Sequence, residues 1–179
     1  VSNLNVGNIS VSGANFISSY VLPKIMDENE ELLAAIEQLN TALKTVITYQ
    51  VGEDTQVLDA SIFQPWLMVS DKMRVSIDEE QLSAYVKELS STYNTCYNKK
   101  RLMTSYGVEV TISNSHYGWK VDSAAEKAEI VASIMAGEQI TRDLNYSMTA
   151  NSHTGNDYGN SYVEINLTAQ HLFLYVNGN

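Results

Sequence analysis

The sequence holds a single cysteine, Cys96, among its 179 residues. One cysteine excludes an internal disulfide framework and a cysteine-rich zinc site. It fits a cytosolic protein and a Gram-positive surface protein equally well, so cysteine usage assigns no compartment. Proline is almost as rare, and Pro65 is predicted to break any long element in the middle of the chain.

Basic residues are scarce as well. Eleven Lys and Arg stand against 21 Asp and Glu, which gives a net charge of −10. Only the short run "NKKR" at 98–101 gathers cations. Because phosphate backbones bind clustered cations, we expect no nucleic-acid partner. An acidic surface also disfavours docking on anionic membranes.

Long apolar runs are missing too. No stretch of 18 or more apolar residues occurs, and none has the apolar centre of a signal peptide. The segment as given is therefore expected to be soluble. It begins at Val1 rather than Met, which indicates a processed form or a piece of a longer reading frame.

Apolar periodicity predicts an α+β fold of short strands and three main helices. The clearest helix spans 27–45, and its apolar residues share one face: Leu32, Leu33, Ile36, Leu39 and Leu43. Two strands, 45–51 and 54–59, follow across a turn, and residues 101–112 are predicted to form a hairpin around Gly107. A helix from Asp78 should bury Leu82, Tyr85, Val86 and Leu89, and a helix from Asp122 to Gly137 should bury Ala125, Ile130, Val131 and Ile134.

The end of the chain differs in character from the rest. A polar, Gly- and Asn-rich stretch at 149–161 predicts a linker. We place a domain boundary there, with a small mixed helix/sheet module at 1–154 and a terminal hairpin at 155–179. The hairpin comprises strands near 162–167 and 171–176, followed by Asn177-Gly178, a strong signal for another turn.

The sequence shows no recognisable set of catalytic residues. Cys96 has no histidine within 15 positions and no Gly-rich turn beside it, so a structural cysteine is the favoured interpretation. The histidines His116, His153 and His171 are too scattered for a zinc motif, and we predict no metal or other cofactor. Carboxylates cluster at helix starts, where capping accounts for them. We predict no catalytic residue in this chain.

Aromatic residues are the remaining candidates for a functional site. Eleven tyrosines and two tryptophans stand beside three phenylalanines. The stretch "HYGWK" at 116–120 places Tyr117 and Trp119 on the same side of an extended segment, as candidates for binding a sugar or peptide. The alternative is that Trp119 is a core residue where a strand meets its helix.

Three stretches together resemble a known family. "NLNVGNISVSG" resembles the opening of the peptidoglycan-binding module found upstream of bacterial L,D-transpeptidase domains. The segment 104–143, with "SYG" and "YGWKVD", is similar to the second half of that module. "GNDYGNSYVEINLTAQHLFLYVNGN" resembles the junction with the catalytic domain and its first hairpin. The specific part of the resemblance covers roughly residues 104–179.

This resemblance implies a parent enzyme that cross-links peptidoglycan stem peptides with a cysteine in a Ser-His-Gly-Cys motif. That motif is absent from the sequence, so no catalytic residue is carried over. The chain would then be a non-catalytic accessory module, extracellular and cell-wall associated, in a protein held by an N-terminal membrane anchor. Its partners would be peptidoglycan and the catalytic domain of the same chain.

Two alternatives stay open. One is a spacer that binds nothing and holds the catalytic domain away from the membrane anchor. A third hypothesis, an independent enzyme using Cys96, requires a histidine within hydrogen-bond reach of its sulfur. The apolar edge at Leu172, Leu174 and Val176 also predicts either self-association through that strand or disorder in the last ten residues.

Overall fold

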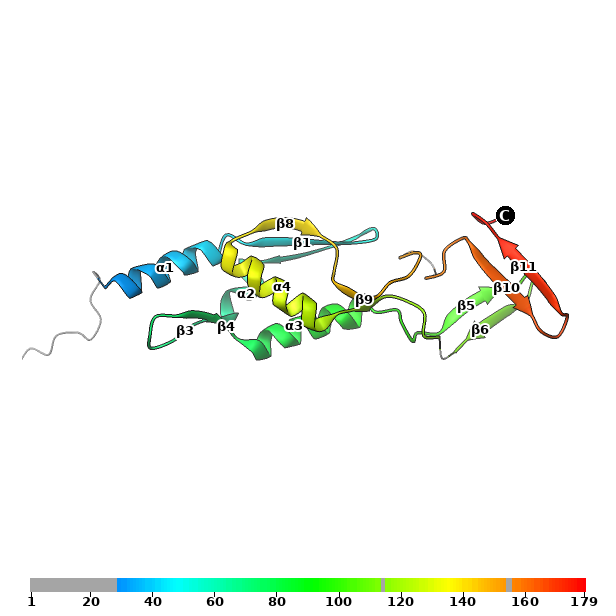
Figure 1. The fold of residues 1–179 in the computed structure, drawn as a ribbon, viewed down its shortest axis with the longest axis horizontal. Coiled ribbons are helices and arrows are strands. Elements are labelled where there is room, and N and C mark those ends of the chain that lie inside the picture. The colour runs from blue at the N-terminus through cyan, green and yellow to red at the C-terminus, as the bar shows by residue number, and fades with distance from the viewer. Residues whose placement is uncertain (1–28, 114, 154–155) are drawn as a thin grey trace, which may run out of the picture.

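The computed structural model describes residues 29–113, 115–153 and 156–179. They form an elongated α+β structure, with helices and a three-stranded sheet in one half and two β-hairpins at the far end (Figure 1). The α+β class is therefore confirmed. The opening stretch "NLNVGNISVSG" and the first two residues of the helix predicted at 27–45 lie outside the described residues. No helix in the described ranges is long and apolar enough to cross a bilayer.

The central sheet is built around β1 (Val46–Val51). Strand β2 (Asp54–Asp59) pairs with it antiparallel, as predicted, across a turn at Gly52. On its other side β1 pairs in parallel with β8 (Gln139–Arg142). The paired residues are far apart in the sequence: Gln139 follows its partner Val46 by 93 positions. Periodicity does not predict β8, because a four-residue strand leaves too short a pattern.

The helices are α1 (Glu30–Ala42), α3 (Glu79–Tyr93) and α4 (Ser123–Ala136). Asp78 and Asp122 cap the last two, each accepting hydrogen bonds from two backbone N–H groups of the first turn. Gly137 ends α4 in the left-handed conformation. A short helix α2 (Ala60–Phe63) and a 3-10 turn η2 (Gln64–Trp66) connect the sheet to a small hairpin of β3 (Leu67–Val69) and β4 (Val75–Ile77).

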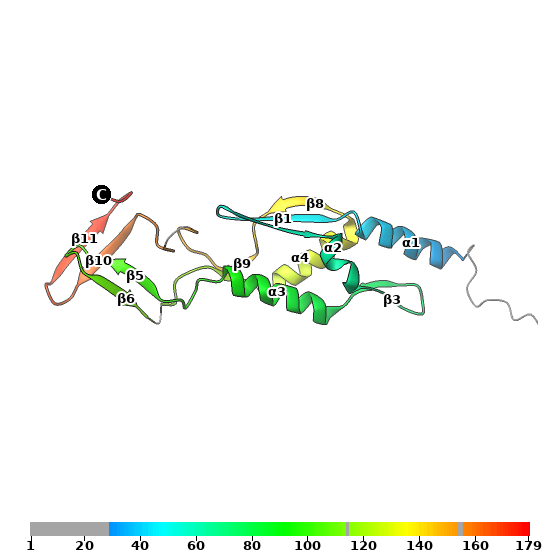
Figure 2. The same ribbon diagram turned by 180° about the vertical axis from the view of Figure 1, so that it is seen from behind.

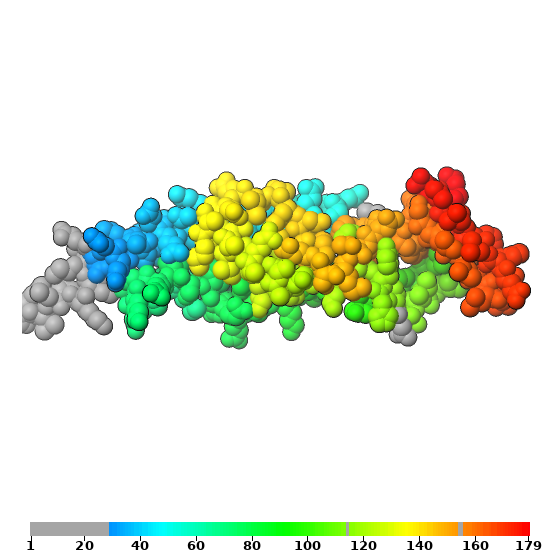
Figure 3. All heavy atoms as spheres, in the orientation of Figure 1, coloured from blue at the N-terminus to red at the C-terminus, as the bar shows by residue number. Residues whose placement is uncertain are grey.

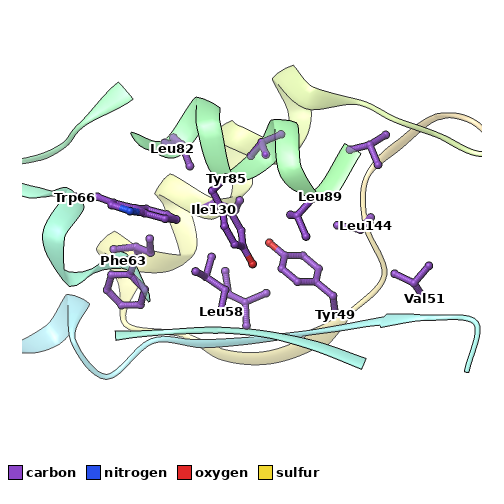
Figure 4. Packing of buried hydrophobic residues seen from close by; sticks show 14 of the residues in the cluster. Tyr49, Val51, Leu58, Phe63, Trp66, Leu82, Tyr85, Leu89, Ile130 and Leu144 are labelled. Atoms are coloured by element: carbon purple, nitrogen blue, oxygen red, sulfur yellow. The ribbon is translucent and has the colours of Figure 1, made fainter. Parts of the chain in front are cut away.

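The core lies between the sheet and the helices α3 and α4 (Figure 4). All four residues predicted for the inner face of α3 are buried. On α4, Ile130 and Ile134 are buried as predicted, but Ala125 is exposed and Glu126 next to it is buried. The remaining members of the core come mainly from the sheet and connector: Ile47, Tyr49, Val51, Leu58, Phe63, Trp66, Val121 and Leu144.

The apolar face predicted for α1 is buried only in part, since Leu32 and Leu39 are half-buried. Leu33 is 52% exposed, and Ile36 and Leu43 are exposed as well, whereas the small residues Ala35 and Ala42 are buried. The reason is geometric: α1 runs out past the end of the sheet and has α4 as its main helical neighbour among the described residues (Figures 1 and 2). A helix with one neighbour buries only a narrow stripe.

At the far end, β5 (Lys100–Met103) and β6 (Glu109–Ile112) form the hairpin predicted around Gly107. Strands β10 (Tyr162–Asn166) and β11 (His171–Tyr175) form the predicted terminal hairpin. Strands β7 (Lys120–Val121) and β9 (Tyr146–Met148) link the two halves. Of the last ten residues, His171–Tyr175 pair with β10, and self-association or disorder at this end stays a prediction.

The two far hairpins are joined by a buried carboxylate. Glu164 on β10 accepts hydrogen bonds from the backbone N–H and the hydroxyl of Ser105, which lies in the β5–β6 turn. The Ser105 hydroxyl also lies 2.5 Å from the Tyr175 hydroxyl. Beside it the Tyr106 ring packs edge-on against Phe173. The terminal hairpin is thus fixed to the turn of β5–β6 rather than hanging free.

A second buried carboxylate, Glu126, ties the helical half together. Its side chain is fully buried. Arg142 on β8 donates two hydrogen bonds to it, at 2.6 and 3.0 Å, and the Tyr49 hydroxyl on β1 donates a third at 2.8 Å. The backbone and side-chain N–H groups of Asn145 donate two more. A buried charge is stable only when paired and fully hydrogen-bonded, as here.

These contacts set the pKa of Glu126. Burial alone would raise the pKa, but the hydrogen bonds from Arg142, Asn145 and Tyr49 favour the charged form and hold the pKa below its ordinary value. Burial, and then the charge of Glu126, raise the pKa of the Tyr49 hydroxyl strongly, so Tyr49 remains a proton donor.

The first prediction concerns Arg142→Met. The substitution leaves the Glu126 carboxylate buried without its cation and should lower the free energy of unfolding by roughly 3–5 kcal/mol. Arg101→Met is the matched control, because that side chain is 78% exposed and should change stability by less than about 0.5 kcal/mol. Urea unfolding of both variants measures this, and equal midpoints would contradict it.

The second prediction concerns pH. Because the pKa of Glu126 is lowered in the folded chain, the unfolded chain takes up this proton first as the pH falls. The stability that the charged Glu126 carboxylate contributes is complete above the ordinary pKa of 4.5. It is lost as the pH falls through the lowered pKa of the folded chain. The stability difference between the wild type and Glu126→Gln should therefore shrink on acidification below that value. A difference that stays constant with pH in urea titrations would refute this.

Candidate functional site

The segment that carries Tyr117 and Trp119 lies tightly against the end of α3. A Cβ on Gly118 would come within 2.5 Å of the Cys96 backbone nitrogen, and the Gly118 φ is +146°, so only glycine fits this position. The N–H groups of Thr95 and Cys96 both donate to the Trp119 carbonyl at 3.0 Å. This close approach fixes the direction in which both aromatic side chains leave the backbone.

Trp119 points toward the loop 151–153. Its indole N–H donates to the Ser152 carbonyl at 2.7 Å, and its ring stacks on His153 at 3.7 Å between centroids. Tyr146 lies against it at 4.8 Å. Burial, and then the carboxylate of Asp143, raise the pKa of the Tyr146 hydroxyl. Trp119 is half-buried, so it is neither a core residue nor a free surface ring.

Tyr117 projects to the same loop. Its hydroxyl accepts a hydrogen bond from the Asn151 N–H at 2.9 Å, and its side chain is 44% exposed. The side chains of both residues predicted for the site therefore contact neighbouring positions of the loop 151–153. We call Tyr117, Trp119, Tyr146 and His153 the aromatic face. Its ligand-binding role stays a prediction.

Two further rings adjoin the same segment. Tyr97 is 54% exposed and meets His116 edge-on at 5.2 Å. The ammonium group of Lys120 lies 5.8 Å from the Tyr97 ring centre. Sequence reasoning did not propose Tyr97 or His153, because each stands alone in a polar stretch. Only the fold brings them beside Tyr117 and Trp119.

The arrangement offers ring surfaces with polar rims, which suits a sugar or a peptide backbone. One side of the Trp119 ring is covered by His153, so only its remaining surface and the Tyr117 ring would be open to a ligand. Trp66, the other tryptophan, is buried in the core against Tyr85 and is no part of this surface.

Cys96 is buried behind this segment. Its sulfur lies 3.7 Å from the His116 carbonyl oxygen and 3.6 Å from the Met148 sulfur. Neither partner is a base, and no ring nitrogen is among its hydrogen-bond partners in the described ranges. His171 lies at the far end, with its Nδ1 2.7 Å from the Tyr106 hydroxyl. Across the described residues no three His, Cys, Asp or Glu side chains gather as metal ligands.

Comparisons with known proteins identify the family and the fold. Residues 28–142 match the family described as "Putative peptidoglycan binding domain". A solved Ldtfm–avibactam carbamoyl enzyme is similar at 26% identity with a TM-score of 0.61, over 82% of this chain and 57% of that one. A cysteine-to-serine mutant of an Enterococcus faecium L,D-transpeptidase is similar at 27% identity with a TM-score of 0.59, over 83% and 58%.

The chain thus spans a little under three fifths of the length of these solved structures. No curated protein matches it significantly. The resemblance found in the sequence is confirmed both by the matched family and by the shared fold. The chain belongs to the family of peptidoglycan-binding domains.

Proposed function

We propose that this chain is the non-catalytic accessory part of a cell-wall L,D-transpeptidase and recognises peptidoglycan through the aromatic face. The observation that carries the proposal is the convergence of Tyr117 and Trp119 on the loop 151–153, where Tyr117 is 44% exposed and Trp119 is half-buried, both beside polar backbone. Rings of this kind hold sugars and peptides by their flat sides and orient them by hydrogen bonds at the rim.

The proposal includes a place for the protein. Peptidoglycan lies outside the cell membrane, so the domain acts extracellularly, in contact with the cell wall. The parent protein would be held there by an N-terminal membrane segment. The net charge of −10 suits contact with amine-bearing stem peptides and disfavours contact with anionic lipid.

The terminal hairpin would be the first part of the catalytic domain. One face of β10–β11 packs toward the β5–β6 turn through Glu164, Phe173 and Tyr175. The opposite face is apolar and open, with cross-strand pairs Val163–Leu174 and Ile165–Leu172. An isolated two-stranded hairpin with an open apolar face is marginal, whereas further strands of a sandwich would cover it.

A second candidate function is that of a spacer. The described part of the chain is rod-like (Figure 3), Trp66 is buried, and His153 covers one side of the Trp119 ring. These features suit an element that holds a catalytic domain at a distance without binding a ligand. Both functions use the same fold, and they differ in whether the aromatic face contributes to binding.

Sedimentation with insoluble peptidoglycan separates the two functions. Tyr117→Ala and Trp119→Ala should each weaken binding about three- to tenfold, since one aromatic contact is worth roughly that much. Tyr106→Ala is the matched control, because Tyr106 is similarly exposed at 48% but lies at the far end. Thermal melts establish that each variant is folded. No binding by the wild type supports the spacer, whereas equal binding by all four proteins shows that peptidoglycan is bound elsewhere than on the aromatic face.

The coding sequence tests the domain arrangement. Within about another hundred residues beyond Asn179, the length that a sandwich of this kind needs, we expect a histidine and a Ser-His-Gly-Cys motif. Reading the gene onward is sufficient. A stop codon at this point would leave a stand-alone domain and would remove the enzyme from the proposal.

A further inference from the structure

The aromatic face depends on residues that lie beyond the matched family domain. The match ends at residue 142, whereas the side chains of Tyr117 and Trp119 contact the loop 151–153. This loop belongs to no helix or strand. Contacts other than regular secondary structure must therefore hold it in place beside the two rings.

Asp157 holds this loop through its backbone. Its carbonyl oxygen accepts hydrogen bonds from the N–H groups of Asn151 at 3.0 Å and Ser152 at 3.1 Å. These are the two residues that the rings contact: the Ser152 carbonyl accepts from the Trp119 indole N–H, and the Asn151 N–H also donates to the Tyr117 hydroxyl. The Asp157 side chain is only 7% exposed, so the residue is fixed inside the protein.

The carboxylate of Asp157 reaches the other side of the site through Thr95. It accepts a hydrogen bond from the Thr95 hydroxyl at 2.9 Å. A hydroxyl has one proton to donate, and its lone pairs remain for the backbone N–H of Trp119, which donates to it at 2.9 Å. The Thr95 N–H in turn donates to the Trp119 carbonyl at 3.0 Å. Both backbone groups of Trp119 are thus bound to Thr95.

Lys100 holds the Asp157 carboxylate in place. The two side chains form an ion pair and are 10% and 7% exposed. The Lys100 ammonium group also donates to the Thr95 carbonyl at 2.8 Å. Removal of either charge would leave the other buried without a partner, which is strongly unfavourable, so the pair keeps its geometry. Lys100 belongs to "NKKR", the run of cations for which the sequence alone offers no role.

We propose that Asp157 is the positioning residue of the aromatic face, with Thr95 as its link to Trp119 and Lys100 as its anchor. Asp157 touches no ligand. It holds the Trp119 backbone and the loop 151–152 in a fixed relation, so that the rings of Tyr117 and Trp119 keep their places. The inference rests on the proposed function, in which these rings bind peptidoglycan.

A consequence concerns the division into domains. Asp157 lies in the segment 155–179, which the sequence assigns to the terminal hairpin and its linker. The aromatic face would therefore be a composite site, with its rings on the peptidoglycan-binding domain and its positioning residue on the junction that follows. The matched domain alone, 28–142, lacks both the loop and Asp157.

Variants of Thr95 test the link while the ion pair stays in place. Thr95→Val has nearly the same shape but no hydroxyl, so the Trp119 N–H and Asp157 each lose a partner. Thr95→Ser keeps the hydroxyl and should restore the behaviour of the wild type. Thr92→Val is the matched control, because it removes the same group from an exposed residue in the last turn of α3.

NMR of the isotope-labelled chain reports the position of Trp119 without any ligand. The chain has two tryptophans, and Trp119→Ala identifies which of the two indole N–H signals belongs to Trp119. In Thr95→Val this signal should shift together with the backbone amide signals of Asn151 and Ser152. Thr95→Ser and Thr92→Val should shift them far less. Unshifted signals in Thr95→Val would overturn the proposal.

Sedimentation with insoluble peptidoglycan reports the effect on binding. Thr95→Val should weaken binding roughly three- to tenfold, the value of one misplaced ring. Because the effect passes through the rings, Thr95→Val should cause no further loss in a chain that already carries Tyr117→Ala and Trp119→Ala. Binding by Thr95→Val as tight as that of the wild type, or a further loss in the chain without the rings, would contradict the positioning role.

A paired substitution tests Asp157 itself. Asp157→Leu together with Lys100→Met removes both charges, so no buried charge is left unpaired. This variant should show the same shift of the Trp119 indole signal and the same loss of binding as Thr95→Val. Thermal melts establish whether it is folded. A folded variant with wild-type signals and wild-type binding refutes the role of Asp157, and if the variant does not fold, the Thr95 variants decide.

The outcome is separable from that of the proposed function. If the wild type does not sediment with peptidoglycan, or if the ring variants bind as tightly as it does, the proposed function fails. The NMR signals then decide alone whether Asp157 positions the rings. If the wild type binds through its rings and Thr95→Val behaves as the wild type does, only this inference fails.

Discussion

The Glu126 carboxylate is the interaction on which the helical half depends. It stands on α4, and its five hydrogen bonds come from β1, β8 and the loop after β8. Apolar contacts between a sheet and a helix tolerate sliding, but a buried charge with fixed donors does not. The network therefore sets the position of α4 on the sheet, and with it the end of the segment 116–119, which precedes β7 and α4.

The position of α4 on the sheet also determines where the aromatic face lies. Strand β7 leads directly into α4, so the placement of α4 also places Trp119, one residue before β7. The backbone of Trp119 is then held by Thr95 and Cys96 at the end of α3. Two helices of the core thus fix the backbone of the aromatic face, while its loop partners at 151–153 cover it from the far side.

Local patterns were sufficient for much of this fold. The caps Asp78 and Asp122, the inner face of α3 and the hairpins around Gly107 and after Tyr162 were predictable, because each depends on residues close in sequence. The burial of Glu126 and the exposure of Leu33 were not, since they depend on which distant elements arrive as neighbours. The same holds for the site: Tyr117 and Trp119 were visible as a pattern, whereas the contact of His153 with Trp119 depends on the fold.

The parallel pairing of β1 with β8 has a consequence for how this chain folds. Val46 pairs with Gln139 across 93 positions of sequence, so during synthesis the sheet can be completed only after the residues of α3, β5, β6 and α4 have been added to the chain. Contacts this distant carry a large loop-closure entropy and slow the search for the native state. Until β8 arrives, the β1–β2 hairpin has an unpaired edge and Glu126 has no cation. The domain should therefore acquire its stability late, in one cooperative step that waits for Arg142.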